Sequence, residues 1–298
     1  MRDQAERLRE LVNIKTYNNR DKKKDNIKRH TRVISITSGK GGVGKTNIAI
    51  NLAISLTKLG HKVIVFDADI GFANVDVILG IIPKYTIADV LNGDKDIYDI
   101  IEYGPNDIGI IAGGSGIKDI MNLSEVQLTK LTNQLISLEN LADFIIIDTG
   151  AGLSNTVMSF VNSSDEVILI ITPEPTSLTD GYAMIKTLAN KNKDLNIKVI
   201  INRVAHEKEG KIVYNKLNMV ANKFLKINVD NIGYINDSKF VSEAVRNQEP
   251  FSLKYPKSIP SKKMKYIAMN IIENKYGSAD DRGMVKFVDK LKNFFLRG

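Results

Sequence analysis

Residues Gly39-Lys40-Gly41-Gly42-Val43-Gly44-Lys45-Thr46 match G-x-x-x-x-G-K-[ST], the pattern of a loop that binds nucleotide phosphates. The apolar run Val33–Ile36 precedes this loop and the helix-like stretch Asn47–Leu59 follows it, as the motif requires. The glycines let backbone N–H groups point at phosphate oxygens, Lys45 can reach the β- and γ-phosphates, and the Thr46 hydroxyl can ligate Mg²⁺. The alternative, a tight glycine turn without a ligand, is disfavoured by this strand, loop and helix setting.

Apolar β-branched runs alternate with helix-length segments along most of the chain. The expected strands are Val33–Ser38, Val63–Asp67, Ile108–Ile111, Phe144–Asp148, Val167–Ile171, Val199–Ile201 and Asn231–Tyr234. The expected helices include Asn47–Leu59, Ser124–Leu138, Thr179–Ala189 and Glu207–Leu225. Strands this apolar are buried on both faces. The pattern predicts an α/β fold, a mostly parallel twisted sheet flanked by helices, with its ligand at the carboxyl ends of the strands.

Composition narrows the class of protein. The chain has 298 residues and no cysteine, which excludes disulfides, thiolate metal sites and cysteine nucleophiles. It begins without a secretory signal and has no apolar run long enough to span a membrane, so we expect it to stay in the cytoplasm. None of its three histidines is assigned as a metal ligand.

The net charge of +8 is carried by the two ends of the chain. Residues 1–32 carry +6 and residues 275–298 carry +3, which leaves −1 for the body between them. This distribution favours an acidic partner or a lipid surface at the ends and makes nucleic acid an unlikely ligand of the body. Non-specific DNA binding through the cluster Arg20–Arg32 stays open.

The second expected strand ends in Asp67-Ala68-Asp69-Ile70-Gly71. Together with the extra lysine Lys40, this segment resembles the MinD/ParA family of ATPases with a deviant phosphate loop, and the resemblance runs from about residue 33 to 272. It implies that Asp69 orients the attacking water and that Asp67 supports the Mg²⁺ region. It also implies that Lys40 crosses a two-fold interface to the partner's phosphates, so that ATP drives formation of a homodimer. The alternative for Asp69 is a cap of the next short helix.

Two later strand ends complete the predicted site. The run Phe144–Ile147 ends in Asp148, which would hold a Mg²⁺-bound water, and Gly150 and Gly152 would let the backbone move with the γ-phosphate. The resemblance implies that Asn202 reads the adenine edge and that Arg203 lies near the base. An amide offers a donor and an acceptor together, as that edge requires. Asn202 as a cap of the following helix is the alternative.

The residues of the predicted site fall into three groups. Contacts to nucleotide are expected from Gly39, Lys40, Gly41, Gly42, Val43, Gly44, Lys45, Thr46, Asn47, Asn202 and Arg203. Catalysis is expected from Lys40, Lys45 and Asp69. Support of Mg²⁺ is expected from Thr46, Asp67 and Asp148. The predicted cofactors are therefore ATP and Mg²⁺.

The C-terminal stretch Met284–Arg297 has the pattern of a basic amphipathic helix. At about 100° per residue, its apolar side chains fall within an arc of about 120°. They are Met284, Phe287, Val288, Leu291, Phe294 and Phe295. Such a helix can lie on an anionic membrane, weakly as one copy and more strongly as two in a dimer. The alternative is a terminal helix packed on the body, and both hold if the helix docks in the monomer.

The N-terminal stretch Asp3-Gln4-Ala5-Glu6-Arg7-Leu8-Arg9 resembles the D-Q-A-x-x-L-R segment of the FlhG group of flagellar-number regulators within that family. The resemblance implies that Asp3 and Gln4 activate a partner, a GTPase of the FlhF type, with Gln4 aiding water positioning at the partner's GTP. Gly150, where many relatives have proline, also favours FlhG. An ordinary charged helix start is the alternative.

We therefore predict an activator arm and basic linker over residues 1–31, an ATPase domain over 32–273, and a linker with a membrane helix over 274–298. The predicted protein hydrolyses ATP, cycles between the cytoplasm and the inner face of the cytoplasmic membrane, and controls flagellar number or placement. A MinD-type division-site ATPase and a ParA-type DNA-segregation ATPase are the alternatives. A nitrogenase-reductase-like enzyme is excluded because the chain has no cysteine to hold an iron–sulfur cluster.

Overall fold

The structure, a computed structural model, describes residues 30–69, 74–114, 116, 123–192, 195–273 and 283–297. Its contacts divide the chain into two units, residues 1–30 and residues 31–298. The second unit contains the sheet and its helices. The predicted activating residues Asp3 and Gln4 lie outside the described residues.

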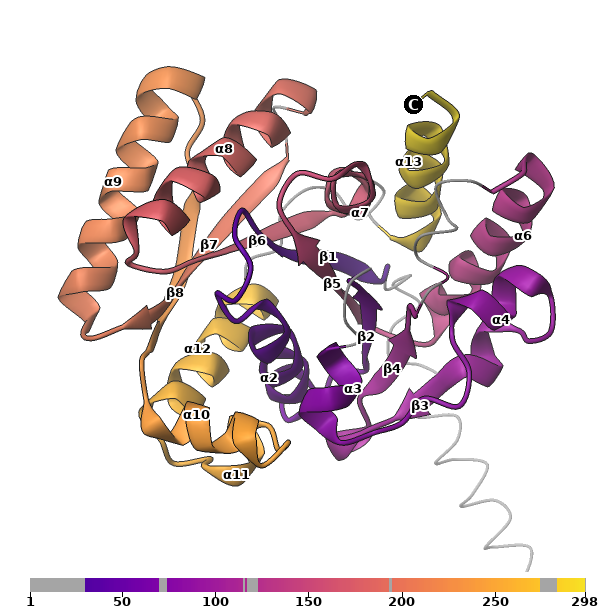
Figure 1. Cartoon of the computed structure of the whole chain (residues 1–298), viewed down its shortest axis with the longest axis horizontal. Coiled ribbons are helices and arrows are strands. Elements are labelled where there is room, and N and C mark those ends of the chain that lie inside the picture. The colour runs from indigo at the N-terminus through magenta and orange to yellow at the C-terminus, as the bar shows by residue number, and fades with distance from the viewer. Residues whose placement is uncertain are drawn as a thin grey trace, which may run out of the picture. The chain divides into compact units, whose positions relative to one another are not determined.

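An eight-stranded sheet forms the centre, in the order β3-β4-β2-β5-β1-β6-β7-β8 (Figure 1). The strands are β1 (Arg32–Ser38), β2 (Val63–Ala68), β3 (Ile101–Tyr103), β4 (Gly109–Ala112), β5 (Phe144–Ala151), β6 (Glu166–Ile171), β7 (Asn196–Val204) and β8 (Asp230–Asn236). All neighbouring pairs are parallel except β3 with β4. The predicted fold class is confirmed. Only the short edge strand β3 was not expected, because three residues are too few for a periodic signal.

Helices cover both faces of this sheet (Figure 1). They are α2 (Lys45–Thr57), α3 (Asn74–Leu79), α4 (Ile87–Asn92), α6 (Glu125–Ile136), α7 (Asn155–Ser163), α8 (Pro175–Lys191), α9 (Glu207–Leu225), α10 (Lys239–Arg246), α11 (Phe251–Lys254), α12 (Ile259–Glu273) and α13 (Met284–Arg297), with 3₁₀ turns η1 (Ile97–Ile100), η2 (Pro105–Asp107) and η4 (Ser137–Asn140). Helices α2 and α12 pack on one face, and α6, α7, α8, α9 and α13 belong to the apolar clusters of the other.

Local chemistry explains where several helices begin. Helix α6 starts with a capping box, in which the Ser124 hydroxyl and the Gln127 side chain bond each other's backbone N–H. Thr86 and Asp89 do the same for α4. Helix α4 has only six residues, which hides its periodicity in the sequence. Such short helices were therefore missed.

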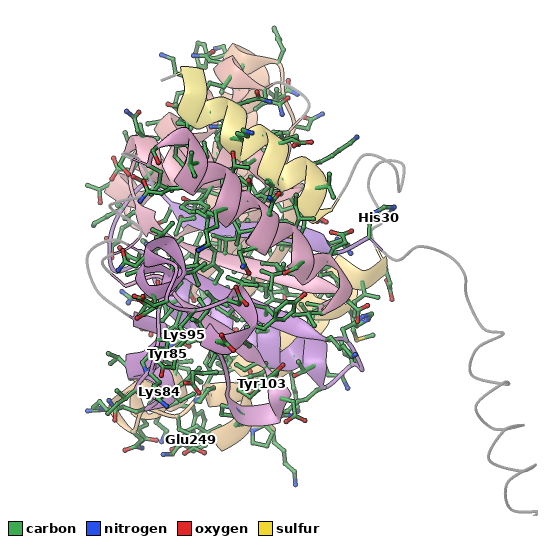
Figure 2. The ribbon with its side chains drawn as sticks, turned by 90° about the vertical axis from the view of Figure 1, so that its right-hand side faces the viewer. His30, Lys84, Tyr85, Lys95, Tyr103 and Glu249 are labelled. Carbon is green, nitrogen blue, oxygen red and sulfur yellow. The ribbon has the colours of Figure 1, made fainter. Side chains whose placement is uncertain are left out.

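Helix α13 lies against the body with its apolar side inward. Met284, Phe287, Val288 and Leu291 are each only 1% exposed, and Phe287 stacks on Phe160 of α7 with ring centroids 6.5 Å apart. Its neighbours are α6 and α7. Figure 2 shows the yellow helix lying along the body. In this structure α13 is therefore packed on the body, with four of the six side chains of the predicted membrane face buried and the other two, Phe294 and Phe295, half-buried.

Candidate nucleotide-binding site

The carboxyl ends of four strands bring the predicted residues together. Strand β1 runs into the phosphate loop, β2 carries Asp67, β5 carries Asp148 and β7 carries Asn202. Asp67 and Asp148 are register partners on the adjacent strands β2 and β5. The site is therefore positioned by the core of the sheet.

The phosphate loop ends at the N-terminus of α2, where the backbone can bind an anion. Gly42 and Gly44 have positive φ values of 74° and 97°, a conformation that favours glycine. Gly44 is the N-cap of α2, no side chain caps the helix, and its first turn holds no acidic residue. The first amides of α2 are therefore available for phosphate oxygens.

Lys45 lies almost buried at the centre of this group, with 8% of its surface exposed. Burial lowers the pKa of its ammonium, and the nearby carboxylates of Asp148 and Asp69 act in the opposite direction. A buried cation flanked by two acids can accept negatively charged phosphate with little further loss of solvation.

Asp148 has the properties of a cation ligand. Its side chain is fully buried, and among the described residues neither carboxylate oxygen has a hydrogen bond of standard geometry, although the Thr46 hydroxyl lies near it. Burial, and then the charge of Asp67, raise its pKa to about 8, while the Thr46 hydroxyl and Lys45 lower it. A buried acid of this kind gains its charge when a cation binds. Thr46, Asp67 and Asp148 therefore fit Mg²⁺, an ion that one or two carboxylates commonly share with nucleotide phosphates.

Asp67 and Asp69 lie at the turn after β2. Asp67 Oδ1 accepts from the Asp69 N–H at 3.1 Å, and its Oδ2 accepts from Val75 N–H at 3.3 Å, in the first turn of α3. Asp69 is half-buried beside Gly150, where an added Cβ would lie 3.3 Å from Asp69 Oδ1. Gly150 thus leaves room for the carboxylate that the sequence predicts to position water.

Lys40 is held within its own chain. Its Nζ lies 2.7 Å from Glu174 Oε2 and 3.1 Å from Thr176 Oγ1, at the start of α8. The sequence did not predict these two residues as partners, because they lie more than a hundred positions from Lys40 and carry no motif.

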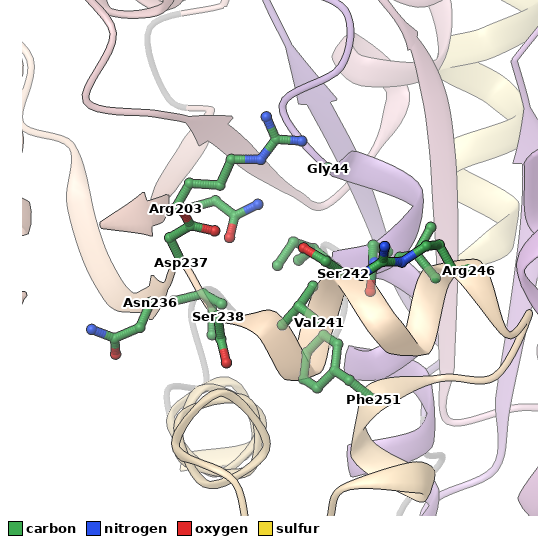
Figure 3. A pocket seen from close by; sticks show the side chains of 14 residues that line it. Gly44, Arg203, Asn236, Asp237, Ser238, Val241, Ser242, Arg246 and Phe251 are labelled. Atoms are coloured by element: carbon green, nitrogen blue, oxygen red, sulfur yellow. The ribbon is translucent and has the colours of Figure 1, made fainter. Parts of the chain in front are cut away.

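A cavity of about 500 Å³ opens beside the phosphate loop. Gly44, Asn47, Asn202 and Arg203 line it, together with the β8–α10 segment. In Figure 3, Arg203 and Asp237 lie on one side and Ser242 and Arg246 of α10 on the other. The residues that the sequence missed are Asn236, Asp237, Ser238, Val241, Ser242, Val245 and Arg246, since an ordinary polar loop and helix give no signal of their own.

Asn202 and Arg203 reach this cavity in different ways. Asn202 is buried, and its Nδ2 donates to the Val43 carbonyl of the phosphate loop at 2.8 Å. The cap of α9 is His206, whose Nδ1 accepts from Glu209 N–H, so the alternative of Asn202 as the helix cap is wrong. Arg203 is exposed and has a φ of 58°, a strained value for a residue with a side chain.

None of the helices in the described ranges has the length and hydrophobicity that crossing a bilayer requires. Within the same ranges, no group of three or more His, Cys, Asp or Glu side chains is arranged to hold a metal by itself.

Comparison with known proteins agrees with this geometry. A family described as an AAA domain matches residues 31–201. Antiactivator FleN of Pseudomonas aeruginosa is 38% identical over 240 residues, which cover 80% of this chain and 86% of FleN. Flagellum site-determining protein YlxH of Helicobacter pylori is 39% identical over 301 residues, which cover 100% of this chain and 98% of YlxH.

Solved structures extend the comparison to the fold. A chain of the MinC:MinD cell division protein complex of Aquifex aeolicus is 26% identical, with a TM-score of 0.67, over 83% of this chain and 98% of that one. Septum site-determining protein MinD of Pyrococcus horikoshii OT3, complexed with Mg-ADP, is 27% identical, with a TM-score of 0.65, over 81% of this chain and 96% of that one. The chain therefore belongs to the MinD/ParA family of ATPases, in the group that includes FleN and YlxH.

Proposed function

We propose that this ATPase is a nucleotide-controlled switch that sets the number or placement of flagella. The observation that carries the proposal is the similarity to YlxH over the whole chain, including the ends that lie outside the family match. The similarity to FleN over the ATPase body supports it.

In this proposal the site binds ATP with Mg²⁺. Lys45 and the first amides of α2 hold the phosphates, and the cavity beside Asn202 and Arg203 holds the base. Thr46, Asp67 and Asp148 would hold the ion, which when bound neutralises charge on the phosphate oxygens. Asp69, close to Lys45, would orient the attacking water by accepting a hydrogen bond from it.

The bound nucleotide would control dimer formation through the position of Lys40. In one chain alone this lysine is paired with Glu174, and the proposed homodimer needs it at the partner's phosphates. Exchange of one carboxylate for the more highly charged triphosphate of ATP favours the dimer. Loss of the γ-phosphate would then favour return of Lys40 to Glu174 and separation of the subunits.

Membrane residence would require α13 to leave the body. Its apolar side is buried here, so the proposed binding to an anionic membrane surface competes with docking between α6 and α7. A single short helix binds a bilayer weakly, and two helices in one dimer gain by effective concentration. The protein would thus cycle between the cytoplasm and the inner face of the cytoplasmic membrane.

The N-terminal arm would act on a GTPase of the FlhF type. This step is supported by the D-Q-A-x-x-L-R likeness of residues 3–9 and by the glutamine at position 4, a residue type that can orient a water at GTP. The proposed activating residues are Asp3 and Gln4.

The test is the GTP hydrolysis rate of a purified GTPase of that type, titrated with this protein and with its Gln4→Ala variant. Stimulation that the variant loses supports the flagellar role and the arm. If the wild-type protein gives no stimulation, the arm assignment is wrong and a MinD-type positioning role becomes the better proposal.

A further inference from the structure

Two carboxylates join the start of the first strand to the start of the last helix. Glu139, in η4, accepts from Thr31 N–H through Oε1 at 3.2 Å and from Met284 N–H through Oε2 at 2.5 Å. Thr31 immediately precedes β1, and Met284 is the first residue of α13. One side chain thus divides its two oxygens between segments that are far apart in the sequence.

Asp165 repeats this arrangement beside it. Its Oδ2 accepts from Val33 N–H at 2.8 Å and from Gly283 N–H at 3.5 Å. Burial raises its pKa to about 6, while the Val33 and Gly283 amides and Lys290 of α13 favour the charged form. Docked α13 therefore supplies two of the groups that stabilise this carboxylate.

The backbone at the start of α13 is built for this contact. Gly283 has a φ of 109°, and a Cβ added to it would lie 2.7 Å from Glu139 Oε1. Its carbonyl accepts from Phe287 N–H, which closes the first turn of the helix. A carboxylate at a helix N-terminus is favoured by the free amides there. The close approach explains why this position needs glycine.

The same region also fixes the start of β1. The Thr31 hydroxyl donates to the Glu139 carbonyl at 2.8 Å or to the Ala142 carbonyl at 2.7 Å, and Thr31 is fully buried. Val33 belongs to the apolar cluster into which α13 inserts Phe287 and Leu291. Removal of α13 would expose part of this cluster and would leave both carboxylates with one backbone donor fewer.

We propose that Glu139 and Asp165 form a carboxylate clamp that couples docking of α13 to anchoring of the chain where it enters β1. Release of α13 loosens the segment from Thr31 to Val33, and loosening of that segment weakens docking, since coupling between two sites is reciprocal. The existence of the clamp does not depend on the proposed function. Its consequence, that the position of the membrane helix controls the root of the activator arm, rests on that function.

The absence of cysteine allows a direct test in the full chain. Leu291→Cys places a thiol at a position that is 1% exposed when α13 is docked, so its rate of maleimide labelling reports undocking. In this background Thr31→Val removes the hydroxyl bonds without touching α13 and should speed labelling roughly fivefold or more. Thr187→Val, which removes a hydroxyl bond to Ala183 within α8, is the matched control and should leave the rate unchanged.

Glu139→Gln tests the carboxylate itself. The amide keeps the size of the side chain but presents one oxygen and one NH₂, so either Thr31 N–H or Met284 N–H loses its acceptor. Labelling should again be faster, and Thr31→Val should add less in this background than it adds alone. Full additivity of the two changes would overturn the clamp.

The reciprocal measurement is hydrogen exchange. Phe287→Asp, which buries a charge if α13 stays docked, should release the helix and speed exchange of the Thr31 and Val33 amides. The sheet amides of β7 serve as the internal control for the fold. Unchanged exchange at Thr31 and Val33 after release would refute the coupling. Neither measurement uses a GTPase or a membrane, so failure of the clamp and failure of the proposed function are told apart.

Discussion

Lys40 and Glu174 form an ion pair at the phosphate loop, with Nζ 2.7 Å from Oε2 and side chains that are 40% and 53% exposed. The hydrogen bond from Lys40, and then its charge, lower the pKa of Glu174. The pair holds the signature lysine of the deviant loop at its own α8. A lysine that must reach another subunit has to break this contact first.

Glu174→Gln should therefore strengthen the ATP-dependent dimer. An exposed ion pair is weak, but its loss from both subunits removes the contact that competes with the dimer, so the dissociation constant of the dimer should fall by a few-fold. Lys40→Ala should stay monomeric with ATP. Analytical ultracentrifugation measures both variants. Glu207→Gln, which breaks the exposed pair with Lys263 on another surface, is the control. A dimer of normal strength in Lys40→Ala would contradict the interface role of this lysine.

Asp148 should make stability depend on pH. Its pKa is raised to about 8 in the folded chain, so the folded state binds a proton more tightly than the unfolded state. The stability contributed by this group is complete below the unfolded pKa and is lost as pH rises through about 8. Without nucleotide, Asp148→Asn should therefore be more stable than the wild type above that pH, by on the order of 2 kcal/mol.

Thermal unfolding across pH measures this difference, and Asp94→Asn at an exposed position is the control. Asp148→Asn should also lose the stabilisation that Mg-ADP gives the wild type. Equal pH profiles of wild type and Asp148→Asn would show that the buried carboxylate does not titrate as described.

Docking of α13 should oppose binding to membranes. A substitution in the body that weakens docking should therefore increase membrane binding, and one that removes an apolar side chain from α13 should decrease it. Phe160→Leu weakens the stack with Phe287 but leaves α13 intact, and we expect about fivefold more protein to sediment with anionic vesicles, for a loss of about 1 kcal/mol of packing. Phe287→Ser removes an apolar side chain of the helix itself and should reduce sedimentation.

The control for this prediction is Ile54→Val, a change to a fully buried side chain in the cluster on the other face of the sheet and outside the nucleotide cavity. Sedimentation that does not rise in Phe160→Leu would mean that docking of α13 does not oppose membrane binding, and unchanged sedimentation of Phe287→Ser would mean that α13 does not act as a membrane helix.

The backbone conformation of Arg203 should cost folding stability, whereas its side chain should contribute to nucleotide binding. Its φ of 58° is strained for a side-chain-bearing residue, so Arg203→Gly should stabilise the fold by about 1 kcal/mol and weaken ATP binding. Lys226→Gly offers a close comparison, because its φ is 59° at the C-cap of α9, outside the cavity. It should gain stability and keep ATP affinity. Thermal unfolding and calorimetric titration separate the two effects, and unchanged affinity in Arg203→Gly would remove this residue from the site.

Much of the nucleotide site could be predicted from the sequence because its determinants are local. The loop from Gly39 to Thr46 specifies its own turn and the start of α2, and a run of apolar residues places Asp148 at a strand end. Strand ends of a parallel sheet meet at one edge, so the predicted acids came together as expected. The opposite wall of the cavity, from Asn236 to Arg246, has no such signal, since its side chains serve there only because α10 packs beside the loop.

The sequence by itself determined the α/β sheet, the phosphate loop and the existence of an amphipathic C-terminal helix, because short-range patterns of glycine, charge and apolar spacing encode them. Only the tertiary structure decided that Lys40 pairs with Glu174, that Asn202 bonds to the Val43 carbonyl, and that the apolar side of α13 is buried on the body. These contacts join residues distant in the sequence. An apolar helix face fits a protein groove and a lipid surface equally well, so its partner depends on what the fold brings beside it.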